Sequence, residues 1–149
     1  MYRVAVGCDP NAVACKEDVM TALKQWGYEV MDMGSDDPLY ANTAYEVGKA
    51  VTDGTCDRGV LICGTGLGMS IAANKVKGVI ATLLTDCYSA ERARKSNDAN
   101  VACFGAFTQG TKVIEMLLKI FLDSEFVPGC ASQVKVDQIR KLEDMSMKV

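Results

Sequence analysis

The sequence contains no histidine. That absence removes the commonest metal ligand and the commonest general base near neutral pH, so any catalysis must rest on thiol, carboxylate, hydroxyl, amine or backbone groups. The cysteines number seven, an odd count, and they form no CxxC pair, which argues against a disulfide framework and against a zinc site. We therefore expect a reducing, cytoplasmic setting and no bound metal.

Long apolar runs and basic patches are lacking too. The longest apolar stretches are strand-sized, so we expect no membrane contact, and the N-terminus runs into a strand pattern without a signal peptide. There are 16 basic and 19 acidic residues, and no basic run indicates nucleic acid. With 49% hydrophobic residues, the 149 residues are enough for one domain, 1–149, with a proper core.

The most informative stretch is Arg58–Gly78, which reads RGVLICGTGLGMSIAANKVKG. It opens as an apolar strand, breaks at three glycines and continues as a helix-like segment over 69–75. The glycines alternate along the chain and are Gly64, Gly66 and Gly68. Such a turn leaves free backbone N–H groups at the helix start, which form an anion site. Cys63 ends the strand and faces that site, so we expect its thiol to be partly thiolate near neutral pH.

The glycine spacing excludes two common nucleotide-binding motifs. GxGxxG fails because Met69 stands where the third glycine is needed, and no Gly-Lys-Ser/Thr follows as a phosphate loop requires. The alternative interpretation is a tight strand-to-helix turn around a buried cysteine, which α/β sheets often build with glycine.

The rest of the chain alternates between strand and helix patterns. Strands are predicted at 2–7, 28–33, 58–63, 79–84 and 101–104, and helices at 12–26, 40–54, 69–75, 86–96, 111–122 and 134–147. This alternation predicts an α/β fold with a parallel sheet covered on both faces. Asp9 follows the first strand, where open α/β sheets place ligands, although Asp9 or Asn11 could instead cap the next helix.

Two of the predicted helices differ in their polarity. The helix over 86–96 carries Glu91, Arg92, Arg94 and Lys95, which we interpret as a solvated face. The helix over 111–122 is apolar on more than one face, which predicts burial on all sides and favours at least a homodimer.

With these features in place, the chain resembles the family of type B ribose-5-phosphate isomerases, which also contains the two subunits of galactose-6-phosphate isomerase. The strongest part is CGTGLGMSIAANKV, Cys63–Val76. Gly7-Cys8-Asp9 resembles the family's opening motif, Tyr40-Ala41 stands where the family has Tyr-Pro, and 97–101 and Gly105 also match. The resemblance implies a Rossmann-like three-layer sandwich with a five-stranded parallel sheet. It also implies a homodimer or dimer of dimers, no cofactor, and a terminal helix (about 134–147) that packs on a partner subunit.

The activity that this resemblance implies is aldose–ketose isomerisation of a small sugar phosphate through an enediolate. Cys63 matches the family's base, the backbone N–H groups around Thr65 match the hole for the enediolate oxygen, and Asp9 and Asn97 match residues that hold substrate hydroxyls. The candidate catalytic residues are Cys63, Thr65 and Ser96. The candidate substrate-binding residues are Asp9, Pro10, Tyr40, Gly64, Gly66, Leu67, Gly68, Asn97 and Lys135.

Several positions depart from the family pattern. Ser96 stands where the family has its ring-opening histidine, Thr85 where some relatives have one, and Pro10 where a histidine follows Asp9. Without imidazole, ring opening should be slow, so we expect a preference for open substrates such as a four-carbon sugar phosphate.

The family's phosphate-binding cations are depleted as well. Phe107 stands at an arginine position, and the two late arginines fall on Cys130 and Val134 or, shifted by one residue, on Ala131 and Lys135. We expect phosphate to be held by Lys135 or by the Arg92/Arg94 helix. Two other functions stay open: a subunit of a heteromeric isomerase, and a non-catalytic sugar- or anion-binding homologue.

Overall fold

The structure is a computed structural model and describes residues 2–147. Its five strands are β1 (Arg3–Cys8), β2 (Glu29–Asp32), β3 (Arg58–Cys63), β4 (Ala81–Leu83) and β5 (Val101–Gly105). All pairings are parallel, in the order β2-β1-β3-β5-β4. The predicted five-stranded parallel sheet is confirmed, and β1 and β3, being internal, are buried along almost their whole length.

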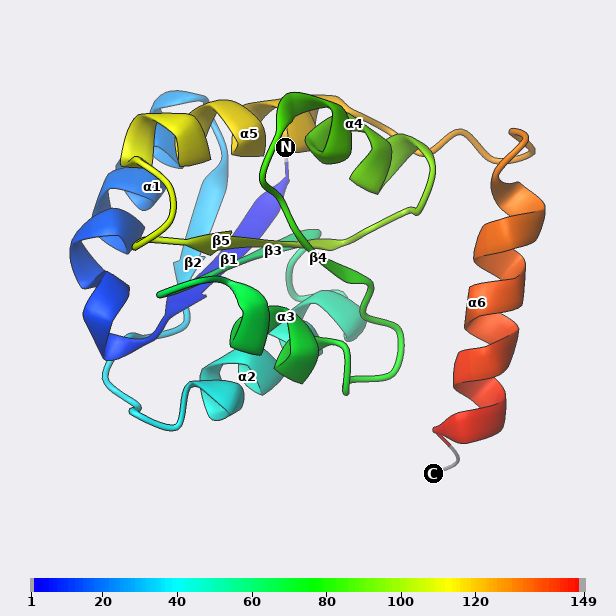
Figure 1. Cartoon of the computed structure of the whole chain (residues 1–149), viewed down its shortest axis with the longest axis horizontal. Helices are drawn as coiled ribbons and strands as arrows, with labels where there is room; N and C mark the ends of the chain where they lie inside the picture. The colour runs from blue at the N-terminus through cyan, green and yellow to red at the C-terminus, as the bar shows by residue number, and fades with distance from the viewer. Residues whose placement is uncertain (1, 148–149) are drawn as a thin grey trace.

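Helices cover both faces of the sheet (Figure 1). One face carries α1 (Val13–Gln25), α4 (Cys87–Lys95) and α5 (Thr111–Asp123), and the other carries α2 (Tyr40–Thr52) and α3 (Leu67–Ala73). Because side chains alternate along a strand, Val60 and Ile62 join the first core while Leu61 and Cys63 join the second. Cys63 therefore lies on the face covered by α2 and α3.

The helix after the glycine turn begins two residues earlier than its pattern indicated. It starts at Leu67 rather than Met69, because Gly66 serves as its N-cap with a φ of 78°. That left-handed conformation costs glycine little and lets the chain turn into a helix immediately.

The prediction that α5 is buried on all sides is wrong for the single chain. Ile114, Leu117 and Phe121 are buried, but Val113 and Met116 are 41% and 52% exposed. The helix is thus amphipathic, with an outer apolar strip that the rest of this chain does not cover.

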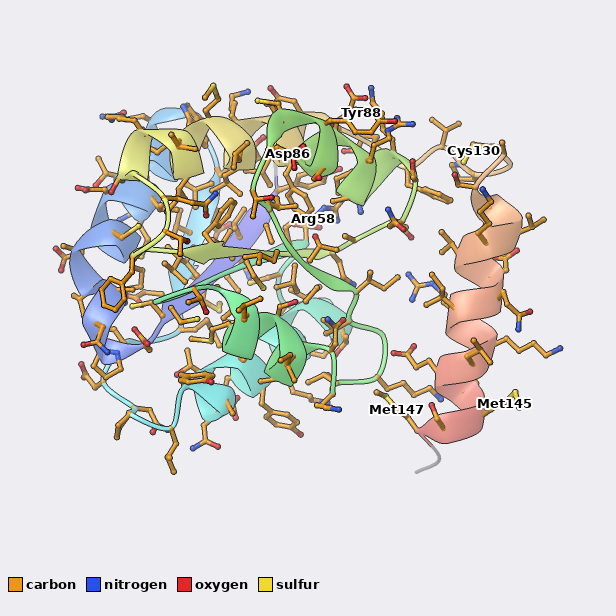
Figure 2. All side chains as sticks on the ribbon, in the orientation of Figure 1. Arg58, Asp86, Tyr88, Cys130, Met145 and Met147 are labelled. Carbon is orange, nitrogen blue, oxygen red and sulfur yellow. The ribbon has the colours of Figure 1, made fainter. Side chains whose placement is uncertain are left out.

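The last helix, α6 (Gln133–Ser146), stands beside the layered body (Figure 1). Only Val136 among its residues is buried. Polar contacts hold the helix: Arg140 pairs with Asp98 at 3.3 Å, and the Glu143 carboxylate accepts a hydrogen bond from the Gly78 N–H at 3.0 Å. Figure 2 shows Met145 on the side of α6 that points away from the sheet layers.

The exposed apolar positions on α6 are Val134, Ile139, Leu142 and Met145, which are 71%, 46%, 53% and 61% exposed. None of the helices within residues 2–147 is both long and apolar enough to cross a membrane.

Candidate active site

Cys63 lies between two neighbouring strand ends. It is the last residue of β3 and pairs with Gly105 of β5, while on the other side the Asp9 N–H donates to the Ile62 carbonyl at 3.1 Å. Its side chain is nearly enclosed, with the residue 4% exposed. The Gly66 N–H donates a hydrogen bond to Sγ of Cys63 over 3.0 Å. The sulfur thus accepts a hydrogen bond from the backbone of the turn that follows it.

The turn after Cys63 carries further N–H groups. The Leu67 N–H donates to Oγ1 of Thr65 at 3.3 Å, so the Thr65 side chain holds the turn. The N–H groups of Gly68 and Met69 belong to the first turn of α3, where no acceptor exists within a helix, and they find none elsewhere in residues 2–147. These donors remain available for an oxygen that carries negative charge.

The glycines of this turn are required by close contacts. A Cβ on Gly66 would lie 2.8 Å from the Phe104 carbonyl carbon, and a Cβ on Gly105 would lie 2.7 Å from the Thr65 carbonyl. At Gly68, the Tyr40 ring and hydroxyl fill the space that a side chain would take. The turn is therefore clamped against the end of β5 and against the start of α2.

Asp9 caps a helix, and its backbone lies beside the end of β3. Its Oδ1 accepts a hydrogen bond from the Asn11 N–H at 3.0 Å, capping the short 3₁₀ helix Pro10–Ala12, so the capping interpretation is confirmed. Asp9 is 8% exposed, and its Oδ2 has no hydrogen-bond partner among the described residues. Pro10, the first residue of that helix, is exposed.

One chain thus brings together Asp9, Tyr40 and the Cys63–Gly68 turn. It does not bring Ser96, Asn97 or Lys135 to them. Ser96 and Asn97 precede β5. The first residue of β5, Val101, pairs with Gly59 at the amino-terminal end of the strands, whereas Cys63 lies at their carboxyl-terminal end. Four residue steps along β5, from Val101 to Gly105, place the two ends of the strand roughly 13 Å apart.

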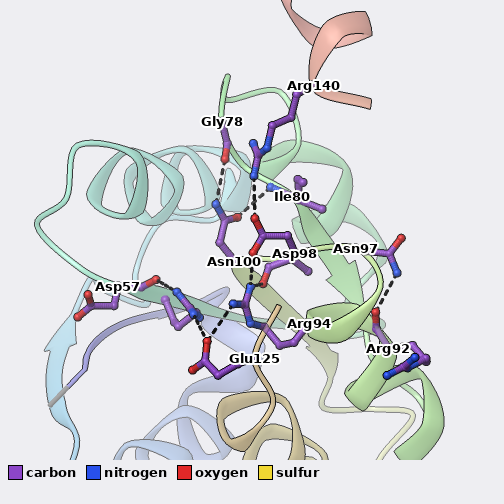
Figure 3. Close-up of polar contacts among 12 residues, drawn as sticks. Asp57, Gly78, Ile80, Arg92, Arg94, Asn97, Asp98, Asn100, Glu125 and Arg140 are labelled. Carbon is purple, nitrogen blue, oxygen red and sulfur yellow. Dashed lines mark hydrogen bonds and ion pairs between the residues drawn. The ribbon is translucent and has the colours of Figure 1, made fainter. Parts of the chain in front are cut away.

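Lys135 is exposed on the first turn of α6. The Asn97 side chain donates to the Arg92 carbonyl at 2.9 Å (Figure 3).

The charged helix α4 is not wholly a solvated face, which corrects that prediction for Arg94. Arg94 is 3% exposed and lies between Asp98, at 3.0 Å, and Glu125, at 3.5 Å (Figure 3). It also donates to the Ala99 carbonyl. Arg94 is therefore committed to a structural network and is removed as a phosphate-binding candidate.

That network extends from Glu125 to Arg58 and Tyr2. Arg58 pairs with Glu125 at 3.6 Å and lies over the Tyr2 ring at 4.9 Å. Burial and the nearby positive charge of Arg94 lower the pKa of the Arg58 guanidinium. No local sequence motif predicts this cluster, because its members come from distant segments of the chain that meet only in the folded protein.

Arg92, in contrast, borders two hollows on the surface. One, of about 230 Å³, is lined also by Thr82, Ser89 and Asn97. The other, of about 280 Å³, is lined also by Lys95, Ala131 and Ser132. Among residues 2–147, Arg92 forms one ion pair, with the half-buried Glu91 at 3.5 Å. It is the α4 arginine that remains available to an anion.

A hollow of about 590 Å³ lies beside the Cys63–Gly68 turn. Tyr40 and Gly68 border it together with Leu39, Ile71 and Lys75. Leu39 and Ile71 are 69% and 63% exposed, so this hollow presents apolar side chains to the outside.

The cysteines buried elsewhere are in environments that hold them as neutral thiols. Burial raises the pKa of the Cys8 thiol to about 12 and raises the pKa values of Cys15 and Cys103. Within the described residues no cluster of three or more His, Cys, Asp or Glu side chains is placed to hold a metal ion.

Comparison with known proteins places this site in a family. A sequence profile described as ribose/galactose isomerase matches residues 4–139. The chain belongs to the ribose/galactose isomerase family. The predicted resemblance is thereby confirmed.

Individual relatives match over nearly their full length. The chain is 43% identical to ribose-5-P isomerase B of Listeria innocua, over 95% of this chain and 97% of that protein. It is 41% identical to D-erythrulose-4-phosphate isomerase of Pectobacterium atrosepticum, over 93% of each. The structure of Leishmania infantum type B ribose 5-phosphate isomerase superposes with a TM-score of 0.91 at 37% identity, covering 98% of this chain and 99% of that chain. The chain is an aldose–ketose isomerase of this family, as predicted.

Proposed function

We propose that this family member interconverts an aldose phosphate and a ketose phosphate with Cys63 as the proton-transferring base, and that its preferred substrate has four carbons. The observation that carries the proposal is the hydrogen bond from the Gly66 N–H to the Cys63 sulfur, at 3.0 Å, inside a turn with unused N–H donors. The Cys63 sulfur and a set of unused backbone N–H donors lie side by side there.

The mechanism follows from these groups. The Cys63 thiolate removes the proton from the carbon next to the carbonyl, and the electron pair moves onto the carbonyl oxygen to form an enediolate. The unused backbone N–H groups of the turn, those of Gly68 and Met69, stabilise that oxygen, each lowering the barrier by about 3 kcal/mol. The proton of the adjacent hydroxyl passes to that oxygen, and the thiol returns its proton to the former carbonyl carbon, so that the carbonyl now stands on the neighbouring carbon. Asp9 accepts a hydrogen bond from a substrate hydroxyl through its open Oδ2.

The site is completed by a second copy of the chain. Ser96 and Asn97 precede the first residue of β5 and Lys135 lies on α6, whereas Cys63 pairs with the last residue of β5 and a hydrogen-bonding group must come within about 3 Å of its target. A homodimer that sets Asn97 of one subunit over Cys63 of the other resolves this separation. The exposed apolar residues of α6 and of the hollow beside Tyr40 supply surfaces for such a contact.

The phosphate of the substrate is held by Arg92. Arg92 shares a hollow with Asn97, so both reach the partner's site together, and its guanidinium can bind phosphate with two parallel hydrogen bonds. Lys135 and Lys95 contribute long-range attraction from nearby positions. The depleted cation count supports an affinity that is modest and sensitive to salt.

The preference for four carbons rests on the lack of a side chain that could open a sugar ring. Ser96, Thr85 and Pro10 offer no side chain that titrates near neutral pH. A four-carbon sugar phosphate needs no such group, because its phosphorylated end cannot close the ordinary ring. The relative named D-erythrulose-4-phosphate isomerase, at 41% identity, supports the same direction.

The test is proton exchange in heavy water. The purified chain is incubated with tetrose, pentose and hexose phosphates, and deuterium at the carbon next to the carbonyl is measured by mass spectrometry and NMR. The proposal predicts incorporation that is fastest with the tetrose phosphate. No incorporation with any of them would contradict it and would favour a subunit that needs a paralogous chain.

A further inference from the structure

Two aromatic rings flank the Cys63 turn. Tyr40 covers Gly68 on one side, and Phe107 covers Gly64 on the other. A Cβ on Gly64 would lie 2.9 Å from Cδ2 and 3.2 Å from Cε2 of Phe107, so the ring lies directly against the peptide that follows Cys63. The Phe107 N–H also donates to the Gly64 carbonyl at 2.9 Å, which ties the backbone of the ring to the turn.

Phe107 is nevertheless exposed. It is 72% exposed, whereas Phe104 and Phe121 are completely buried. An aromatic ring held at the mouth of a site contacts water in the free protein and a ligand or partner when bound. A phenyl group has no charge and no hydrogen-bonding group, so it can contact carbon–hydrogen surface but cannot satisfy a phosphate or a hydroxyl.

The ring also restricts approach to the thiol. Cys63 is 4% exposed, and the Phe107 ring lies against Gly64, the residue that follows it, so the ring forms one wall beside the thiol. The thiol must meet the carbon next to the carbonyl, so the position of that end of the sugar is fixed. Any added length must then be accommodated against the surrounding walls.

We propose that Phe107 is a length-determining wall, which discriminates against sugar phosphates longer than four carbons by setting an apolar ring where an extra hydroxylated carbon would need a polar neighbour. This inference rests on the proposed function. An added hydroxyl pressed against the ring loses its hydrogen bond to water without gaining another.

The experiment uses substrates that are both acyclic, so that ring opening plays no part. D-erythrulose 4-phosphate and D-ribulose 5-phosphate differ by one hydroxylated carbon, and neither can close the ordinary ring. Deuterium incorporation in heavy water is measured with each for the wild-type homodimer, Phe107→Leu and Phe107→Ala. Tyr88→Ala is the matched control, because Tyr88 is an aromatic residue that is 74% exposed.

The expected result is graded. Phe107→Ala raises the ratio of five-carbon to four-carbon kcat/KM at least about tenfold, the scale set by one carbon unit in a shaped site, and Phe107→Leu raises it less. Tyr88→Ala leaves the ratio unchanged. A ratio that Phe107→Ala leaves unchanged, with the four-carbon substrate still turned over, overturns the wall and leaves the proposed function standing. Absence of exchange with both substrates in the wild-type protein overturns the proposed function, and the wall with it.

Discussion

Cys63 and Asn97 lie at opposite edges of the same sheet. Cys63 pairs with Gly105 at the carboxyl end of β5, whereas Asn97 precedes Val101 at its other end. In the proposed site, Asn97 of one subunit reaches the sugar bound at Cys63 of the other, so the proposed chemistry depends on how two copies of the chain associate.

The shared site predicts complementation between inactive variants. Cys63→Ala and Asn97→Ala should each be nearly inactive alone, because each removes one component from every site. Co-refolded at equal amounts, half the dimers are mixed and hold one intact site, so roughly a quarter of wild-type activity should return. Sedimentation should show a dimer at micromolar concentration. A mixture as inactive as its components, or a stable monomer with full activity, would show that the site belongs to one chain.

The phosphate site predicts a specific effect of Arg92. Arg92→Ala should raise KM for the sugar phosphate at least about tenfold, the scale of one charge-assisted hydrogen bond, and should do so more at low salt than at high salt. Lys135→Ala should have a smaller effect of the same sign. Arg94→Met is the contrasting variant, since loss of this buried partner of Asp98 should lower the melting temperature. Unchanged KM in both Arg92→Ala and Lys135→Ala would assign phosphate binding to the backbone.

The missing imidazole predicts a gain of function. Ser96→His should speed turnover of ribose 5-phosphate, whose ring must open, more than turnover of a tetrose phosphate, which is already open. The two substrates are compared by kcat/KM across neutral pH. If the wild-type protein already isomerises ribose 5-phosphate as fast as the tetrose phosphate, another group opens the ring and the four-carbon preference is wrong.

The glycine turn predicts a strong position effect. Gly66→Ala should destabilise the protein by at least about 2 kcal/mol. A left-handed conformation costs a non-glycine residue roughly 1–2 kcal/mol, and the new methyl group would also clash with the Phe104 carbonyl. Gly110→Ala is the control, because nothing lies within 4 Å of its Cβ position and its φ is −69°. Urea unfolding of both variants measures the difference. Equal stability of the two would contradict the packing described around the turn.

The sheet and the turn could be predicted from local patterns. Alternating strand and helix periodicity was enough for the parallel sheet, and the run from Arg58 to Cys63 coincides with β3. The glycines after Cys63 indicated a strand-to-helix turn because left-handed backbone and close approach both require glycine. Both patterns depend only on residues that are close together in the sequence.

Other features depend on contacts between distant segments. The charged sequence around Arg94 predicts a surface residue, and Glu125, its ion-pair partner, comes close to it only in the folded protein. The separation of Asn97 from Cys63 likewise follows from strand register, which composition does not encode. The apolar pattern of α5 predicted full burial, but the chain alone supplies neighbours for one face, leaving Val113 and Met116 exposed.

The most direct test of the central claim compares wild-type protein with Cys63→Ala in heavy water on D-erythrulose 4-phosphate. Removal of the base should lower the rate of deuterium incorporation at least about a hundredfold, the usual contribution of a positioned base. Cys87→Ala, which removes an exposed thiol on α4, is the control and should exchange at the wild-type rate. Wild-type exchange that disappears only in Cys63→Ala is the predicted result; exchange that persists at near wild-type rate without the Cys63 thiol would contradict the account.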